Sequence, residues 1–377
     1  MCGVGVDTGG NKLTHQLIEV DMKAFGFLSF GHYGHGTGIG DPDAKTSLQD
    51  ALDITIGADE LGVNGAYWRV HHFARQAASP IAMLAAAGAR TKNIEVGTGV
   101  IDMRYENPLM LAEDIATLDL LLDQRIAIGV SRGSPEPAKR GWEAFGYTGS
   151  TDPRGADIAY SHFDQFLSAI KGEGQADLDA SGYILGTPPS GPRLRIEPHS
   201  PGVEKRIWWG AGSRQTAIWA AQQGVNLMSS TLLTETEDGK NFSQLQNEQI
   251  ELYRRTWKEA GHDFTPRVSV SRSIFPIVDA ADAKLFGRAG EAHDSIGIID
   301  GLHSTFGKTY AAEPDVLIEQ LLDDEAVMNA DTLMLTIPSN YGVDLNLKIL
   351  ENFATHVAPA LGWRPNTKGL PTGYPVD

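Results

Sequence analysis

Short apolar runs alternate with segments of helical spacing along most of this chain, and this alternation constrains the fold more than any other feature. We expect eight strands, over residues 23–30, 64–70, 93–101, 125–131, 206–210, 225–230, 267–278 and 331–338. A segment with apolar residues at helical spacing follows each strand, over residues 47–61, 80–87, 108–122, 156–171, 213–223, 242–260, 314–323 and 344–357. Repeated strand–helix units build a parallel sheet, and eight of them close a (β/α)8 barrel of the α/β class. An open doubly wound sheet is the alternative that the spacing leaves open.

The chain has 377 residues, and a (β/α)8 barrel uses about 250 or more. We therefore expect one barrel over residues 22–363, with insertions near 172–192 and 287–313. The second of these contains glycine and histidine with weak periodicity, which is typical of a loop or lid. Residues 1–21 and 364–377 are interpreted as terminal tails.

The charge and the cysteine content exclude several classes of protein. The net charge is −17, which argues against broad binding to nucleic acid or to anionic lipid. Cys2 is the only cysteine, so no intramolecular disulfide and no cysteine-based metal centre is expected. The longest apolar stretch is far shorter than the roughly 20 residues of a membrane span. With no signal peptide evident at the N-terminus, the sequence favours a cytoplasmic protein.

In a barrel of this kind the active site lies at the carboxyl ends of the strands. His71 and His72 follow the second strand, where a histidine can act as a general acid or base. Being adjacent, they point to opposite faces of a strand, so they do not form a metal site together. Asp102 and Glu106 add no recognisable metal-binding spacing to them. The structural alternative is one buried and one solvated histidine.

A second group of candidates could hold a phosphate. Gly210 and Gly212 let the backbone approach a ligand at the start of a helix, and the hydroxyls of Ser213 and Thr216 lie at its first turn. Arg132, between Ser131 and Gly133 at the end of the fourth strand, offers a guanidinium that matches phosphate oxygens. The alternatives are an ordinary helix cap for Ser213 and a surface ion pair for Arg132.

Taken together, the runs TKNIEVGTGVIDMRYENP, RIAIGVSRG and WGAGSRQTAIWAA resemble the bacterial luciferase-like, flavin-dependent monooxygenase family. The resemblance extends from Lys23 to about Trp363. It implies a (β/α)8 barrel with insertions that binds reduced FMN or, in a related branch, a deazaflavin coenzyme. It also implies that His71 lies beside the flavin ring with His72 as its neighbour. Arg132, Ser213 and Thr216 would then bind the flavin phosphate.

Other positions match or depart from the family pattern. Thr98 and Gly99 match the segment that usually carries a non-prolyl cis peptide under the flavin ring. Asn107 stands where many relatives have histidine. Ser131 replaces the reactive cysteine of luciferases, which argues against light emission from an aldehyde. Val70 replaces the usual glutamate before the two histidines, so His71 must have a different partner.

The resemblance implies a flavin-dependent oxidoreductase, and we expect a monooxygenase that uses reduced FMN and molecular oxygen on a small organic substrate. It further implies a separate flavin reductase and a homodimer formed through helices near strands two and three. One alternative is a deazaflavin-dependent dehydrogenase or reductase, although its charged tail would need more basic residues near the site than the sequence shows. The other is a catalytically silent flavin-binding protein.

Overall fold

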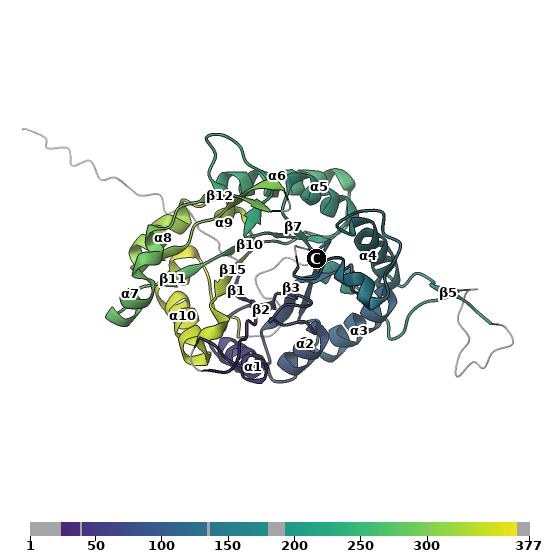
Figure 1. Ribbon diagram of the computed structural model, residues 1–377, viewed down its shortest axis with the longest axis horizontal. Helices are drawn as coiled ribbons and strands as arrows, with labels where there is room; N and C mark the ends of the chain where they lie inside the picture. Colours follow the sequence, from purple (N-terminus) through teal and green to yellow (C-terminus); the bar gives the residue numbers. More distant parts are fainter. Residues whose placement is uncertain (1–23, 38–39, 134–135, 180–192, 300, 368–377) are drawn as a thin grey trace, which may run out of the picture.

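A closed parallel barrel forms the centre of the molecule. The computed structural model describes residues 24–37, 40–133, 136–179, 193–299 and 301–367. Within these residues, eight strands close the barrel in the order β1-β15-β10-β8-β7-β4-β3-β2. Helices form a ring outside the strands (Figure 1). The (β/α)8 barrel expected from the sequence is therefore confirmed, and an open doubly wound sheet is excluded.

The barrel elements lie close to their predicted ranges. The strands are β1 (Ala24–Ser29), β2 (Gly65–Trp68), β3 (Glu95–Asp102), β4 (Ile126–Ser131), β7 (Ile207–Ala211), β8 (Asn226–Ser229), β10 (Val268–Arg272) and β15 (Thr332–Ile337). The surrounding helices are α1 (Ala44–Glu60), α2 (Pro80–Gly88), α3 (Pro108–Leu121), α4 (Ala156–Ile170), α5 (Arg214–Gln223), α6 (Phe242–Ala260), α8 (Pro314–Leu322), α9 (Glu325–Asn329) and α10 (Val343–His356).

Local sequence explains where these elements begin and end. The barrel strand β1 is buried along its whole length, as expected for a parallel strand covered on both faces. Asn107 caps α3, because its side-chain oxygen accepts hydrogen bonds from the N–H groups of Leu109 and Met110, both at 3.1 Å. Gly62 follows the end of α1 with φ +78°, a left-handed conformation that favours glycine.

The amino ends of the strands are closed by a buried ion pair. Arg267 donates two hydrogen bonds to Glu95, at 2.8 and 3.0 Å, and both side chains are almost fully buried. The Tyr67 hydroxyl donates to the same carboxylate at 2.7 Å. The Arg267 guanidinium also lies over the Trp208 ring, 4.6 Å from its centroid. This end of the barrel is thus filled by a buried ion pair, a tyrosine hydroxyl that donates to it and an aromatic ring.

The region after β10 differs from the expectation. The predicted strand 267–278 is in fact two strands. The chain leaves the barrel at the end of β10, and the next strand, β11 (Ile274–Pro276), pairs instead with β14 (Tyr310–Ala312). A helix, α7 (Ala280–Phe286), follows where none was predicted, although Asp279 and Asp282 form a capping box at its start.

Residues 287–313 are not an irregular loop. After a short 3-10 helix they contain the antiparallel strands β12 (Ser295–Ile299) and β13 (Leu302–Phe306), and β13 also pairs with β9 (Leu232–Leu233). Alternating apolar residues followed by an Asp-Gly dipeptide at 300–301 are a hairpin signal that the periodicity reading missed.

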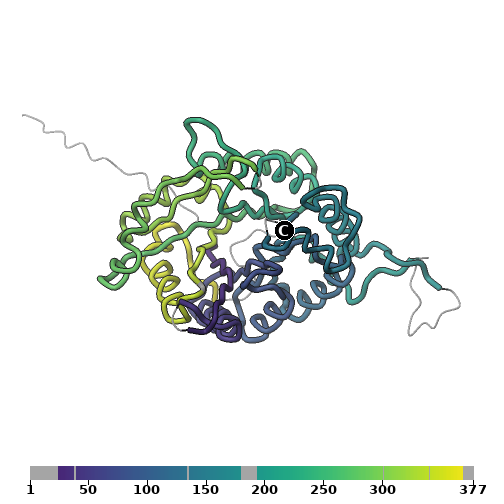
Figure 2. The backbone as a smooth tube through the Cα atoms, in the orientation of Figure 1, coloured from purple at the N-terminus to yellow at the C-terminus, as the bar shows by residue number. Residues whose placement is uncertain are grey.

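The predicted insertion at 172–192 is only partly described. Its first residues include β5 (Ala176–Asp177), which pairs antiparallel with β6 (Arg193–Leu194), and residues 180–192 lie outside the described part. The two short strands stand outside the ring of helices (Figure 2). The predicted tail at 1–21 also lies outside the described residues. Of the tail at 364–377, residues 364–367 are described, and Asn366 packs on the barrel through hydrogen bonds to Gly62 and Asn93.

The remaining short elements are 3-10 turns: η1 (Gly141–Phe145), η2 (Val203–Arg206), η3 (Gly287–Glu291), η4 (Ser339–Tyr341) and η5 (Ala358–Leu361). Among the residues that the structure describes, no helix is both long enough and apolar enough to cross a membrane.

Candidate active site

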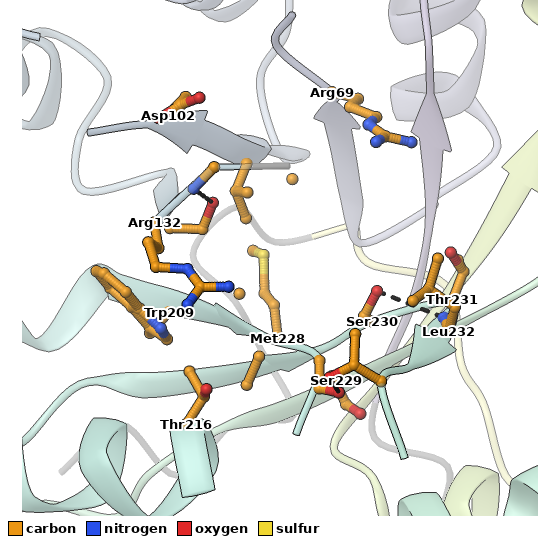
Figure 3. Close-up of a pocket in the computed structure, with 18 of the residues that line it drawn as sticks. Arg69, Asp102, Arg132, Trp209, Thr216, Met228, Ser229, Ser230, Thr231 and Leu232 are labelled. Carbon is orange, nitrogen blue, oxygen red and sulfur yellow. Dashed lines mark hydrogen bonds between the residues drawn. The ribbon is translucent and has the colours of Figure 1, made fainter. Parts of the chain in front are cut away.

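A cavity of about 490 Å³ opens at the carboxyl ends of the barrel strands. All eight barrel strands or the loops that follow them contribute to its wall, and Figure 3 labels some of these side chains. Its volume lies within the range of small-molecule and cofactor sites. Of the residues predicted for the site, the cavity is lined by His71, Gly99, Ser131, Arg132, Gly210, Gly212, Ser213 and Thr216.

The floor of the cavity is apolar. Leu28 of β1, Met228 of β8 and Met334 of β15 belong to one buried cluster inside the barrel, and Val100 packs against it. Long unbranched methionines adapt to flat ligands without a large loss of packing. The inner end of the cavity thus offers a surface for a planar ring system.

Arg132 enters the cavity from the end of β4. Figure 3 shows its guanidinium reaching towards the side where Trp209 and Thr216 lie. It forms no ion pair with any carboxylate of the described residues, so the surface salt bridge considered as an alternative is not present in this part of the chain. A cation without a counter-charge in a concave site is suited to an anion.

Some of the N–H groups at the start of α5 already have hydrogen-bond partners within the protein. Ser213 caps the helix, with its Oγ accepting from the N–H of Thr216 at 3.2 Å and lying 2.9 Å from the Thr216 hydroxyl. The N–H of Arg214 already donates to the carboxylate of Glu235 at 2.9 Å. The cap interpretation is therefore correct for the Ser213 side chain. The two hydroxyls still line the cavity and remain able to donate to a ligand.

Two buried glutamines of α6 hold the loops beside this end of the cavity. Gln249 donates to the carbonyl oxygen of Ser213 at 2.9 Å and accepts a hydrogen bond from the Ser229 hydroxyl. Gln246 donates to Ser229 Oγ at 2.8 Å and to the Ser230 carbonyl at 2.9 Å. Both glutamine side chains are fully buried, so these loops are fixed from behind.

His71 has an arginine as a hydrogen-bonding partner. Arg69 Nε donates to His71 Nε2 at 2.7 Å. Arginine has donors only, so Nε2 must carry the lone pair and the proton must lie on Nδ1. Burial, followed by the charge of Arg69, lowers the pKa of His71 to about 4. The ring is therefore neutral at physiological pH.

His72 lies behind the cavity wall and is not among the residues that line it. Its ring stacks on Tyr105, with ring centroids 4.2 Å apart. The backbone N–H of His72 donates to the carboxylate of Glu136 at 3.3 Å. The Tyr105 hydroxyl donates to the same carboxylate. Glu136 itself lines the cavity. Burial raises the pKa of its carboxyl group, although the two hydrogen bonds act in the opposite direction. His72 thus supports the wall through Tyr105 and Glu136.

Thr98 and Asn107 also lie outside the cavity lining. The Thr98 hydroxyl is buried and donates to the carbonyl of Gly129 at 2.8 Å, which ties β3 to β4. Asn107 is occupied as the cap of α3. Gly99 does line the cavity, and the peptide bond between Gly99 and Val100 is cis. The β3–β4 register shifts between Thr98 and Ile101, at this same place.

A second cavity, of about 290 Å³, shares part of its wall with the first. Arg132, Gly133, Glu136 and Arg154 line both. The second cavity also has Arg104, Lys139 and Arg140 in its wall, so five basic side chains surround it. The sequence suggested few basic residues near the site, and the structure corrects this, because the segment between β4 and α4 brings four basic residues to Arg104, which follows β3.

Sequence reasoning missed three charged residues of the main cavity: Arg69, Glu136 and Arg154. Arg69 lies two residues before the predicted His71, so its position at a strand end was a usable signal. Glu136 and Arg154 lie in the irregular segment between β4 and α4, where no periodicity indicates which side chains turn inward. No group of three potential metal-binding side chains lies together in the described residues.

A closed barrel with its main cavity at the carboxyl ends of the strands is the architecture of (β/α)8 barrel enzymes. The family model for luciferase-like monooxygenases matches residues 22–312. The chain belongs to this family of flavin-dependent monooxygenases, as the sequence motifs predicted.

Individual relatives are distant. The oxygenase component of the flavin-dependent trigonelline monooxygenase of Acinetobacter baylyi is 24% identical over 247 residues, covering 61% of this chain and 65% of that protein. The matched region spans about three fifths of the length of such relatives.

Two solved structures show the shared fold. One is the oxygenating constituent of 3,6-diketocamphane monooxygenase of Pseudomonas putida in complex with FMN, with a TM-score of 0.60 and 16% identity over 89% of this chain and 98% of that chain. The other is the coenzyme F420-dependent tetrahydromethanopterin reductase of Methanopyrus kandleri, with a TM-score of 0.57 and 14% identity over 90% and 99%.

Proposed function

We propose that this protein is a monooxygenase that uses reduced FMN and molecular oxygen on a small organic substrate. One observation carries the choice of cofactor site. Arg132 has no carboxylate partner within the described residues and enters the same cavity as the hydroxyls of Ser213 and Thr216. A guanidinium and two hydroxyls are donors suited to a phosphate, which FMN carries at the end of its side chain.

The residues present fit this cofactor. The phosphate would bind to Arg132, Ser213 and Thr216, and the planar ring would lie over the apolar floor that includes Met228 and Met334. Gly210 keeps the wall thin there, because an added Cβ would lie 3.1 Å from a methyl carbon of Val100. A side chain at this position would crowd the floor.

Bound reduced FMN supplies two electrons, so that dioxygen gives one oxygen atom to the substrate and one to water. The chain's own groups position and shield this chemistry. His71 keeps its proton on Nδ1 while Nε2 accepts from Arg69, so it serves as a neutral hydrogen-bonding group beside the ring. Ile299 and Leu302 of the β12–β13 hairpin line the cavity and add apolar surface to its wall.

The likeness to an oxygenase component supports a two-component system, in which a separate reductase supplies the reduced flavin. We also propose a homodimer. The exposed apolar residues Met110, Leu120 and Leu121 of α3 support a contact through this helix.

Anaerobic titration with reduced FMN, followed by an air pulse, tests the proposal. We expect saturable binding of reduced FMN and a rate of flavin oxidation after the pulse that differs from that of free flavin. A substrate screen then seeks product that contains labelled oxygen from ¹⁸O₂. Absence of FMN binding would overturn the cofactor assignment, and binding with oxidation identical to that of free flavin would indicate a silent flavin carrier.

The five basic residues of the second cavity favour one other candidate, a deazaflavin-dependent dehydrogenase or reductase. A deazaflavin transfers hydride and reacts poorly with oxygen. The same titration with reduced deazaflavin coenzyme separates the candidates, since tight binding without oxygen consumption would favour hydride transfer.

A further inference from the structure

We propose that the sulfur of Met228 is a modification site, which accepts an oxygen atom and becomes a methionine sulfoxide when no organic substrate is bound. The inference rests on the proposed function, because it needs reduced FMN and dioxygen in the main cavity. It goes beyond that function, since it gives the protein an oxygen acceptor within its own chain and thereby a limit on turnover without substrate.

Met228 lies in the floor of the main cavity. Its side chain is 5% exposed, lines the cavity and belongs to the same buried cluster as Met334. Figure 3 shows the sulfur of Met228 extended away from β8, towards the space that the lining residues surround. The thioether therefore lies in the surface over which the flavin ring is proposed to rest.

Gly129 of β4 leaves room for this sulfur. A Cβ atom added at Gly129 would lie 2.6 Å from the sulfur of Met228 and 2.9 Å from a methyl carbon of Val100. The sulfur and the methyl group are thus packed over the same glycine, and Val100 itself lines the cavity. The thioether is held between β4 and β8, beside a residue of the cavity lining.

A thioether is polarizable and is oxidised to a sulfoxide by gain of one oxygen atom. In the proposed step the O–O bond of dioxygen breaks, and one oxygen atom forms an S–O bond with Met228. The other oxygen atom leaves as water, with the two electrons and two protons that reduced FMN supplies. Reduced FMN, dioxygen and the thioether give oxidised FMN, the sulfoxide and water, so no further reductant is needed.

The other methionines distinguish an oxidant in the cavity from one in solution. Met110 and Met328 are 64% and 37% exposed, so peroxide in the solvent reaches them before Met228. Met103 is fully buried and is not among the residues that line the cavity. Oxidation that begins in the cavity would invert the order of exposure, with Met228 oxidised ahead of all three.

A sulfoxide at this position would change the floor of the cavity. The neighbours of Met228 in its cluster include the apolar side chains of Leu28 and Met334. An S–O group is polar and larger than the thioether, so it disturbs such packing. We therefore expect the modification to weaken FMN binding, and a protein that turns over without substrate to inactivate itself.

Oxygen labelling followed by peptide mass spectrometry tests the proposal. The protein receives successive equivalents of reduced FMN and ¹⁸O₂ without organic substrate, and catalase removes peroxide that reaches the solvent. We expect the labelled fraction of Met228 to exceed that of Met110 and of Met328 about fivefold or more. Unlabelled hydrogen peroxide, added to a second sample without flavin or catalase, should oxidise Met110 and Met328 ahead of Met228.

The dissociation constant of FMN supplies a second readout. In the wild type it should rise with the number of cycles, whereas in Met228→Leu, a change that nearly conserves volume, it should keep its own starting value. Met110→Leu is the matched control and should behave as the wild type does.

Three results would contradict the proposal. Labelling of Met110, Met328 or Met103 to the same extent as Met228 would assign the oxidation to peroxide in solution or to unfolding. Saturable binding and oxidation of reduced FMN without label at Met228 would overturn the modification site and leave the proposed function standing. Failure of reduced FMN to bind would overturn both together.

Discussion

At the scale of single residues, Arg132 carries the proposed phosphate contact. A hydrogen bond to a charged group contributes about 1.5–3 kcal/mol, so Arg132→Ala should raise the dissociation constant of FMN by about tenfold or more. Riboflavin has the same ring without the phosphate, so its affinity should be unchanged by the substitution. Isothermal titration with both ligands measures this difference. An FMN affinity that survives the loss of Arg132 would remove this residue from the site.

Burial and, after it, the neighbouring Arg69 act on the protonation of His71. Burial and the Arg69 charge lower the pKa of His71 to about 4, whereas it is about 6.5 in an unfolded chain. The unfolded chain therefore binds more protons between these values, and this histidine reduces stability as the pH falls from about 6.5 to 4. We expect Arg69→Met to raise the pKa of His71 and to allow both ring tautomers.

Nitrogen NMR of the histidine rings checks this prediction without reference to turnover. The wild type should show His71 protonated at Nδ1 alone from pH 8 down to about 5. Arg75 provides the control, because it contacts a different histidine, His35, at 2.9 Å. Arg75→Met should leave the His71 signals in place. An Arg69→Met protein with unchanged His71 titration would show that burial alone sets the protonation state.

The sequence predicted which strand and helix ends meet at the cavity better than it predicted which side chains line that cavity. His71, Arg132, Ser213 and Thr216 all lie at strand or helix ends, where the barrel rule applies, and the structure brings them to one cavity. His72 is not among the lining residues, and alternation along a strand does not by itself show which of two adjacent side chains faces the cavity.

At the scale of elements, α6 holds the start of α5 in place. Gln249 donates to the Ser213 carbonyl, so Gln249→Leu should loosen the turn that carries the two hydroxyls proposed to bind the phosphate. We expect FMN to bind roughly three- to tenfold more weakly, as for the loss of about one hydrogen bond, while riboflavin affinity stays constant. Gln222→Leu, on the exposed face of α5, is the control. An equal loss for both ligands would indicate general loosening of the barrel instead.

The boundaries of elements with a strong apolar periodicity were predicted to within a few residues. Elements without such a periodicity were not predicted. The long buried strands and amphipathic helices of the barrel follow directly from their apolar spacing. The β12–β13 hairpin and α7 lie outside the barrel, where Ile296 and Ile298 remain exposed and the pattern carries little burial signal. Their positions depend on tertiary contacts with β9 and β11, which a local pattern does not contain.

At the scale of the whole molecule, one buried carboxylate joins four separate elements. Asp324, which caps α9, accepts hydrogen bonds from Arg272 at the end of β10, from the Tyr310 hydroxyl of β14 and from Ser243 of α6. Burial alone would raise the pKa of Asp324, but the Arg272 guanidinium and these hydrogen bonds hold it at about 2. Its contribution to stability is therefore present above about pH 4 and is lost as the pH falls to about 2.

We expect Asp324→Asn to lower the free energy of unfolding by about 3–5 kcal/mol at pH 7, because it leaves Arg272 buried without a counter-charge. Urea unfolding at several pH values measures the loss, which should shrink as the pH falls from about 4 towards 2. Asp263→Asn, at an exposed position, is the control. A loss that stays constant over this range would assign the effect to packing and not to charge.

The Glu95–Arg267 pair closes the barrel at the end opposite to the cavity. Neither residue of this pair lines the cavity. Removing one partner would leave the other charge buried and destabilise the barrel, whereas side chains of the cavity rim can be exchanged without disturbing this pair. We therefore expect substitutions that change the substrate of such a chain to accumulate at the carboxyl ends of the barrel strands.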